Sequence, residues 1–286
     1  MEYYFPASVA EAITLMQRYG EQARLIAGGT DLLLDIERQC YHAQALVDVT
    51  RIPVLQRMEL DGGGVTIGAA VTYSRLLAWS AFCEGVPLLA DAIRRIGSVQ
   101  IRNVATLVGN ITNASPAGDA LPPLYVLGAQ VHVDGPQGRR LVPIEKFVLG
   151  VRRIALEPGE LVTHVTFYLP GSGWCGAFGK VGLRRAMIIT VANVAVLLLA
   201  EDGRMAEARI ALGAVAPTVL RVPEVEAFLA GSTLDEETVV QAGRLATRAA
   251  QPIDDVRASA SYRREVAGGL VRRTLRELRS QVAKEG

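Results

Sequence analysis

At residues 25–33 the chain reads Leu25-Ile26-Ala27-Gly28-Gly29-Thr30-Asp31-Leu32-Leu33. The apolar start favours a short buried strand, the glycine pair ends it, and Thr30 or Asp31 can cap a helical turn that follows. Glycines at such a bend let backbone N–H groups approach an anion without an intervening Cβ. The stretch therefore predicts a cradle for a phosphate or pyrophosphate. A bend with a purely structural role is the alternative interpretation.

A second stretch, at residues 101–119, is rich in small and polar residues. It reads Ile101-Arg102-Asn103-Val104-Ala105-Thr106-Leu107-Val108-Gly109-Asn110-Ile111-Thr112-Asn113-Ala114-Ser115-Pro116-Ala117-Gly118-Asp119. Glycine, amides, hydroxyls and one acid are the groups that hydrogen-bond a polyhydroxylated, phosphorylated ligand. The alternative is an ordered loop whose polar side chains bond its own backbone. Low charge and weak periodicity predict a loop over 97–123.

Spacing and turn residues predict alternating helices and strands around these two stretches. Ser8 and Glu11 form a capping box ahead of a helix over 8–19. The other elements expected in this part are strands at 25–27 and 45–49, a hairpin of 55–60 with 65–68, helices at 72–79 and 87–96, a hairpin of 131–133 with 141–144, and a strand at 161–169.

The pattern changes after a glycine-rich linker at 171–174. Strands come first and helices follow, which predicts an α+β second domain. These elements are strands at 176–182, 190–199 and 205–212 and helices near 223–230, 236–250 and 260–282.

Composition narrows the class of protein. With 286 residues, 50% of them hydrophobic, the chain is long enough for about two domains. Thirty Lys and Arg against 29 Asp and Glu give a net charge of +1, which argues against nonspecific binding to nucleic acid or anionic membranes. Three scattered cysteines, no recognisable signal peptide and an apolar run limited to residues 191–200 predict a cytoplasmic protein.

One motif match fails its context, and the sequence gives poor support for nucleophilic or general-base catalysis. Residues 171–176 match Gly-x-Gly-x-x-Gly, but Pro170 precedes them and a strand-like run follows, so a Rossmann bend is not expected. Two of the three histidines, His132 and His164, lie in predicted strands, where a surface imidazole is expected. Any chemistry is therefore expected to come from a bound cofactor.

Taken together, residues 27–33 and 101–119 closely resemble the FAD-binding medium subunits of the molybdenum hydroxylases. This family includes the flavin subunits of bacterial xanthine dehydrogenase and aerobic carbon monoxide dehydrogenase. The resemblance covers essentially the whole chain. It extends to Phe178-Gly179-Lys180 with Arg184-Arg185, which is similar to the family's lysine motif, and to Tyr262-Arg263-Arg264, which is similar to its C-terminal signature.

The resemblance implies an α+β fold with an FAD-binding domain of the p-cresol methylhydroxylase (PCMH) type. That domain would span residues 1–172, as two α+β subdomains of about 1–54 and 55–172. A small C-terminal α+β domain, like that of the carbon monoxide dehydrogenase flavoprotein, would span 173–286.

The resemblance also implies which residues bind FAD. Gly28, Gly29, Thr30 and Asp31 would wrap the pyrophosphate, Asp119 would bond sugar hydroxyls, and Lys180 would lie near the isoalloxazine edge. The full set is Leu25, Ile26, Ala27, Gly28, Gly29, Thr30, Asp31, Leu32, Ile96, Ala105, Thr106, Leu107, Val108, Gly109, Asn110, Asn113, Asp119, Leu161 and Lys180.

For function, the resemblance implies an FAD subunit of a heterotrimeric molybdenum hydroxylase, and two rival hypotheses stand beside it. Electrons would come from a large molybdopterin subunit through a small 2Fe–2S subunit and leave to NAD, a quinone or dioxygen, with the complex a dimer of heterotrimers. This chain itself would bind no metal. The rivals are a free-standing flavin oxidase or reductase on the same fold, and a non-enzymatic assembly module whose arginine pairs dock partners.

Overall fold

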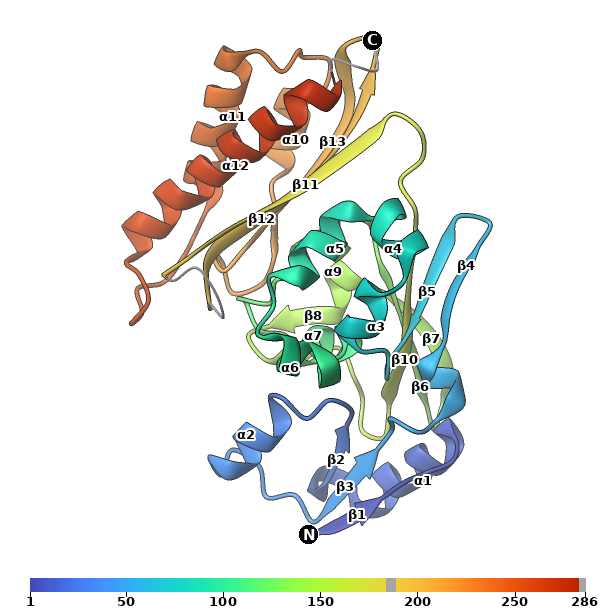
Figure 1. Cartoon of the computed structure of the whole chain (residues 1–286). Coiled ribbons are helices and arrows are strands. Elements are labelled where there is room, and N and C mark those ends of the chain that lie inside the picture. The colour runs from blue at the N-terminus through green and yellow to red at the C-terminus, as the bar shows by residue number, and fades with distance from the viewer. Residues whose placement is uncertain (184–188, 283–286) are drawn as a thin grey trace. The chain divides into compact units, whose positions relative to one another are not determined.

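The structure is a computed structural model that describes residues 1–183 and 189–282 (Figure 1). Arg184 and Arg185 of the lysine motif therefore lie outside the described residues. The chain forms two compact units, each built from three segments. The first unit comprises Met1–Trp79, Ser98–Ala114 and Gly128–Tyr168, and the second comprises Ser80–Gly97, Ser115–Leu127 and Leu169–Gly286.

The first unit begins with a small parallel sheet of order β1-β3-β2. The sheet and its helices are β1 (Glu2–Tyr4), α1 (Val9–Tyr19), η1 (Gly20–Gln22), β2 (Ala23–Ile26), α2 (Leu32–Glu37), β3 (Ala45–Asp48) and η2 (Pro53–Gln56). The helix predicted over 8–19 is confirmed as α1. The Ser8 side chain accepts from the Glu11 N–H at 3.1 Å, while the Glu11 carboxylate accepts from the Ala7 N–H at 2.7 Å.

An antiparallel sheet of order β4-β5-β10-β6-β7 forms the rest of the first unit's framework. Its strands are β4 (Met58–Asp61), β5 (Gly64–Gly68), β6 (Gln130–Gly135), β7 (Gly138–Pro143) and β10 (Leu161–Tyr168). Successive side chains of a strand point to opposite faces of the sheet. Val131, Val133 and Val165 are therefore buried on one face, while His132 and His164 lie on the other, partly exposed face. Both predicted hairpins are confirmed.

Short helices and a two-stranded hairpin complete this unit. They are α3 (Tyr73–Leu77), α6 (Val99–Val104), α7 (Leu107–Asn113), α9 (Ile144–Phe147), β8 (Val148–Gly150) and β9 (Arg153–Ile154). The prediction of a loop over 97–123 is wrong. Ser98 and Thr106 cap α6 and α7 by accepting the N–H of Ile101 and Gly109, and such six- or seven-residue helices are too short to show a clear helical period.

The second unit is a four-stranded antiparallel sheet covered by helices (Figure 1). Its elements are α4 (Ser80–Gly85), α5 (Pro87–Arg94), α8 (Leu121–Val126), β11 (Trp174–Gly182), β12 (Thr190–Glu201), β13 (Arg204–Gly213), β14 (Leu220–Arg221), α10 (Pro223–Leu229), α11 (Glu236–Ala249) and α12 (Ala260–Val282). The predicted order of strands followed by helices is confirmed for residues 174–183 and 189–282, and the α+β class with it.

Strand β12 is buried on both faces. Val194, Val196 and Leu198 belong to the core formed with α10, α11 and α12. Residues of the opposite face, such as Ala195 and Leu197, are also buried, and α8 contacts β12 and β13 while α5 contacts β11. A strand that is covered on both sides has apolar residues at successive positions, and this explains the apolar run at residues 191–200. Among the described residues, no helix is both long and apolar enough to cross a membrane.

Candidate functional site

The first glycine-bearing segment forms the predicted bend between a strand and a helix. β2 ends at Ile26, Gly28 and Gly29 follow, and α2 begins at Leu32. Gly29 has a φ of +69°, a left-handed conformation that favours glycine. Asp31 occupies the N-cap position of α2, but its side chain makes no capping hydrogen bond. The Asp31 carboxylate is exposed, so the local backbone does not use it.

The second segment consists of two capped helical turns joined at Ala105. α6 ends at Val104, and Thr106 begins α7 by accepting the Gly109 N–H on its hydroxyl at 2.9 Å. The Ala105 backbone is fixed from a third element, because its carbonyl accepts the Tyr73 N–H at 3.0 Å. The backbone at this joint is therefore held in place by the protein alone.

The two segments meet at the level of the backbone. A Cβ built on Gly28 would lie 2.2 Å from the Val104 carbonyl oxygen and 2.8 Å from the Ala105 Cα. No real side chain tolerates such distances, and the obstructing atoms are backbone rather than a flexible side chain. Glycine at residue 28 is thus required by close approach, although its φ is not left-handed. The sequence-predicted bends are brought together in one unit.

Asn110 carries an unusual polar atom on the second segment. Its Oδ1 is buried and, within the described part of the chain, has no hydrogen-bond partner. A buried amide oxygen without a donor costs about 1–3 kcal/mol, so proteins rarely keep one unless a ligand or water supplies the donor.

The remaining predicted residues of the first unit show a range of exposure. Leu161 is 1% exposed at the start of β10, and Thr106 is 4% exposed. Asn113 is half-buried at the C-terminal end of α7. A contact of Leu161 with a ligand stays a prediction.

Three predicted residues, Ile96, Asp119 and Lys180, belong to the second unit. The Lys180 ammonium donates to Asp119 Oδ2 at 2.5 Å and to the Arg95 carbonyl at 3.3 Å. Ile96 follows Arg95 directly along the chain. This arrangement brings Asp119 and the Arg95 carbonyl to one buried ammonium group.

The carboxylate of Asp119 is satisfied by the protein. Its Oδ1 accepts from Thr190 at 2.6 Å and from Asn193 at 2.8 Å, and the side chains of Asp119 and Lys180 are each 7% exposed. The structure gives Asp119 a role in holding Lys180, and sugar binding by Asp119 stays a prediction.

Sequence reasoning missed Arg152, which contacts both α2, the helix after the first bend, and the end of α7. Arg152, between β8 and β9, forms a salt bridge with Asp35 of α2. Its backbone N–H also donates to the Ala114 carbonyl at 3.1 Å, at the end of α7. The hydrogen bond with Asp35 raises the pKa of the Arg152 guanidinium, so its charge is maintained. The one available signal was an acid within the apolar run Leu32-Leu33-Leu34-Asp35-Ile36.

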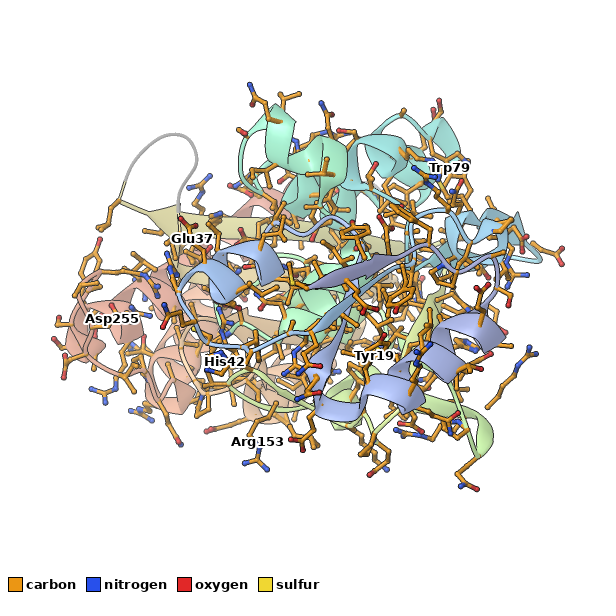
Figure 2. The ribbon with its side chains drawn as sticks, turned by 90° about the horizontal axis from the view of Figure 1, so that it is seen from below. Tyr19, Glu37, His42, Trp79, Arg153 and Asp255 are labelled. Carbon is orange, nitrogen blue, oxygen red and sulfur yellow. The ribbon has the colours of Figure 1, made fainter. Side chains whose placement is uncertain are left out.

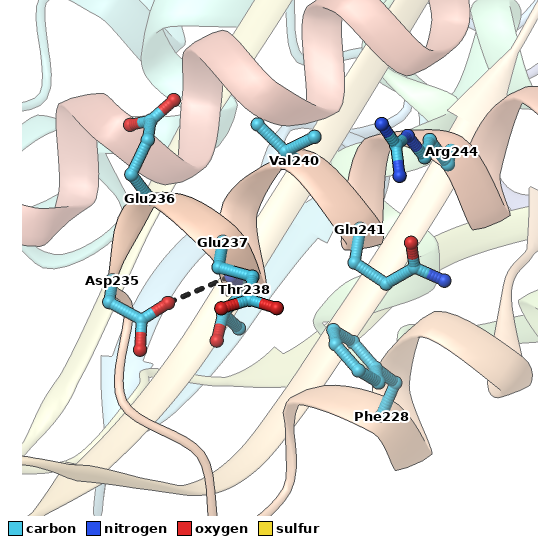
Figure 3. A pocket seen from close by; sticks show the side chains of 8 residues that line it. All are labelled: Phe228, Asp235, Glu236, Glu237, Thr238, Val240, Gln241 and Arg244. Atoms are coloured by element: carbon cyan, nitrogen blue, oxygen red, sulfur yellow. Dashed lines mark hydrogen bonds between the residues drawn. The ribbon is translucent and has the colours of Figure 1, made fainter.

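An open pocket of about 480 Å³ lies elsewhere, between α10 and α11 of the second unit. Figure 3 shows its lining, which is Phe228, Asp235, Glu236, Glu237, Thr238, Val240, Gln241 and Arg244. Two of its carboxylates serve the fold: Asp235 caps α11 by accepting the Thr238 N–H at 2.8 Å, and Glu236 pairs with Arg276. Three acidic residues oppose a phosphate-bearing ligand. Among the described residues no cluster of three potential metal ligands occurs.

Comparison with known proteins defines the class of this chain. Residues 1–170 match the FAD binding domain in molybdopterin dehydrogenase, and residues 177–278 match the carbon monoxide dehydrogenase flavoprotein C-terminal domain. The chain is thus a flavoprotein of the oxidoreductase class.

Individual relatives match over nearly their full length. The carbon monoxide dehydrogenase medium chain of Hydrogenophaga pseudoflava is 33% identical, over 96% of this chain and 95% of that one. The xanthine dehydrogenase FAD-binding subunit of Escherichia coli O157:H7 is 30% identical, over 96% and 94%. A solved structure of quinoline 2-oxidoreductase from Pseudomonas putida 86 matches with a TM-score of 0.93 and 28% identity, covering 99% and 98% of the two chains. The chain belongs to the FAD-binding medium-subunit family of the molybdenum hydroxylases, and FAD is its cofactor.

The residues of the first unit fit that cofactor. The bend at Gly28 and Gly29 has no Cβ, and it abuts the second segment's backbone at Val104 and Ala105. FAD carries hydroxyl and N–H groups that can donate hydrogen bonds. The buried Asn110 Oδ1 has no such donor among the described residues.

Proposed function

We propose that this chain is the FAD subunit of a heterotrimeric molybdenum hydroxylase. It would stand between a small 2Fe–2S subunit, reduced by a large molybdopterin subunit, and an external acceptor that is NAD, a quinone or dioxygen. FAD supplies the exchange between one-electron and two-electron transfer. We further propose that the complex is a dimer of heterotrimers in the cytoplasm.

One observation carries the proposal: the backbone contact of Gly28 with Val104 and Ala105. It joins the two segments that carry most of the predicted cofactor contacts. In this proposal residues 1–172 act as the FAD-binding domain, and the bend from Gly28 to Asp31 holds the pyrophosphate. Residues 105–110 provide backbone and amide contacts to the cofactor. Within the second unit, Asp119 holds the Lys180 ammonium; the position of Lys180 near the isoalloxazine edge stays a prediction.

The proposal is tested by a matched pair of glycine variants in the full-length chain. Gly28→Ala places a Cβ 2.2 Å from the Val104 carbonyl oxygen, whereas a Cβ at Gly171 meets nothing within 4 Å. We expect the wild-type chain and Gly171→Ala to bind FAD with a flavin absorption spectrum, and Gly28→Ala to lose it. The melting temperature of each FAD-free chain separates loss of binding from loss of folding. A wild-type chain that stays colourless after reconstitution, or a Gly28→Ala chain that binds FAD normally, would contradict the proposal.

The acceptor and the assembly are tested separately. The chain is reduced anaerobically and mixed in turn with NAD⁺, a quinone and dioxygen. The return of the oxidised flavin spectrum identifies the acceptor. Light scattering on the complex purified from its natural source measures whether two heterotrimers associate. Turnover of a small alcohol by the isolated chain would instead support a free-standing flavin oxidase.

A further inference from the structure

The turn between β8 and β9 holds its backbone in a rarely used conformation. Arg152 has a φ of +54°, although it is not glycine. Its N–H donates to the carbonyl of Ala114, which has a φ of +46° and ends α7. Two left-handed non-glycine residues are thus bonded to each other. Such conformations persist only where the surroundings determine them, and they concentrate at binding sites.

The Arg152 side chain reaches a different element. It forms a salt bridge with Asp35, whose residue is only 6% exposed, in the middle of α2. A carboxylate at this depth needs a cation or several donors to remain charged. The Arg152 side chain is 46% exposed, so its guanidinium keeps contact with water. The pair therefore fixes α2 without requiring full desolvation of both charges.

Arg152 thus contacts the two helices, α2 and α7, that follow the glycine-bearing bends, and it does so away from Gly28. α2 follows the Gly28-Gly29 bend, and α7 follows the Ala105 joint. The Gly28 contact fixes one end of this pair of segments, and Arg152 fixes the other through Asp35 and Ala114. Loss of the Arg152 contacts would release α2 and α7 from the turn between β8 and β9 and change the spacing of their backbone donors.

We propose that Arg152 is a positioning residue of the FAD site, setting the spacing of the two glycine-bearing segments without touching the cofactor. The inference rests on the proposed function, because it assigns the cofactor to those segments. Arg152 acts through Asp35 with its side chain and through Ala114 with its backbone.

The experiment measures the FAD dissociation constant of the full-length apoprotein, with the visible circular dichroism of bound FAD as a second readout. Arg152→Gly removes the side chain but keeps the N–H and accepts a positive φ. Arg152→Lys keeps a cation, and Asp35→Asn removes the charge from the other side. Arg153→Ala is the control, because Arg153 is the exposed neighbour labelled in Figure 2.

We expect Arg152→Gly and Asp35→Asn each to weaken FAD binding about tenfold, the usual scale for losing one charge-assisted hydrogen bond. The double variant should bind as weakly as either single variant, since both remove the same ion pair. Arg152→Lys should recover most of the affinity and the wild-type dichroism, and Arg153→Ala should match wild type.

Equal FAD affinity and dichroism for Arg152→Gly and Arg153→Ala would overturn the inference. Additive effects of Arg152→Gly and Asp35→Asn would overturn it too, because the two residues would then act separately. If Arg152→Gly does not fold, Asp35→Asn provides the same test, because it leaves the turn between β8 and β9 unchanged. Wild-type FAD affinity and dichroism in Asp35→Asn would then overturn the inference. A wild-type chain without FAD affinity would refute the proposed function itself, which separates the two failures.

Discussion

Replacing Asp119 with asparagine should destabilise the second unit by about 3–5 kcal/mol, the range for breaking a buried ion pair by removing one partner. The Asp119 carboxylate accepts from Lys180 at 2.5 Å, Thr190 at 2.6 Å and Asn193 at 2.8 Å. An asparagine amide offers one oxygen and an NH₂ group that cannot accept. At least one of these donors therefore loses its acceptor, at about 1–3 kcal/mol, and the Lys180 ammonium loses the facing carboxylate.

Urea unfolding of the full-length apoprotein measures this loss. Trp174 lies in β11, the strand that carries Lys180, and the chain has two tryptophans. A Trp79→Phe background leaves Trp174 as the fluorescent reporter of the second unit. Asp202→Asn is the matched control, because Asp202 is exposed in the turn between β12 and β13.

Adding Lys180→Met to Asp119→Asn should restore most of the stability, because both buried charges are then gone. A loss below about 1 kcal/mol for Asp119→Asn would refute the reasoning, since a buried pair costs more than that to break. A double variant less stable than Asp119→Asn would refute it as well.

Two further predictions concern the first unit. Burial, and then the positive charge of His132, lower the pKa of His164 from 6.5 to about 4, so below pH 6.5 the unfolded chain takes up a proton that the folded chain excludes. The free energy of unfolding should therefore fall between pH 6.5 and 4, by about 1–2 kcal/mol after screening of this half-buried group. Thermal unfolding at a series of pH values measures this, and His164→Gln should give a melting temperature that depends less on pH. The control His42→Gln should keep the pH dependence of the wild-type chain. Thr106→Ala removes the cap of α7, so it should lower the free energy of unfolding by about 1 kcal/mol and also weaken FAD binding. The control Asp235→Ala removes the cap of α11 and should lower stability by a similar amount. An FAD titration should show unchanged affinity for this control.

Local signals in the sequence predicted much of the fold. The helix after Ser8, both hairpins and the three C-terminal helices follow from caps, glycine turns and periodicity, which depend on neighbouring residues. The helices within 97–123 were missed because each is only six or seven residues long. Ser98 and Thr106 cap these helices, but no longer apolar stripe follows either residue to mark a helix in the sequence.

In the candidate site too, local features could be predicted from the sequence and long-range contacts could not. The bend at Gly28 was predicted from its own residues, and its contact with Val104 confirms that the two stretches meet. Contacts across long sequence separations could not be foreseen. Asp35 and Arg152 are 117 residues apart, and Asp119 and Lys180 are 61 apart. Nothing local distinguishes Arg152 from its neighbour Arg153, because the difference lies in a left-handed turn that sequence patterns assign to glycine.

The composition of the second unit also limits how this polypeptide can be dissected. Its sheet is covered on one side by α5 and α8, which come from the amino-terminal half of the gene product. A fragment starting at residue 173 would carry β11, β12 and β13 with Leu197 and Ala195 stripped of that cover. Such a fragment would expose a contiguous apolar surface and aggregate. Fusion or exchange between relatives should therefore transplant segments 80–97 and 115–127 along with the carboxyl-terminal portion.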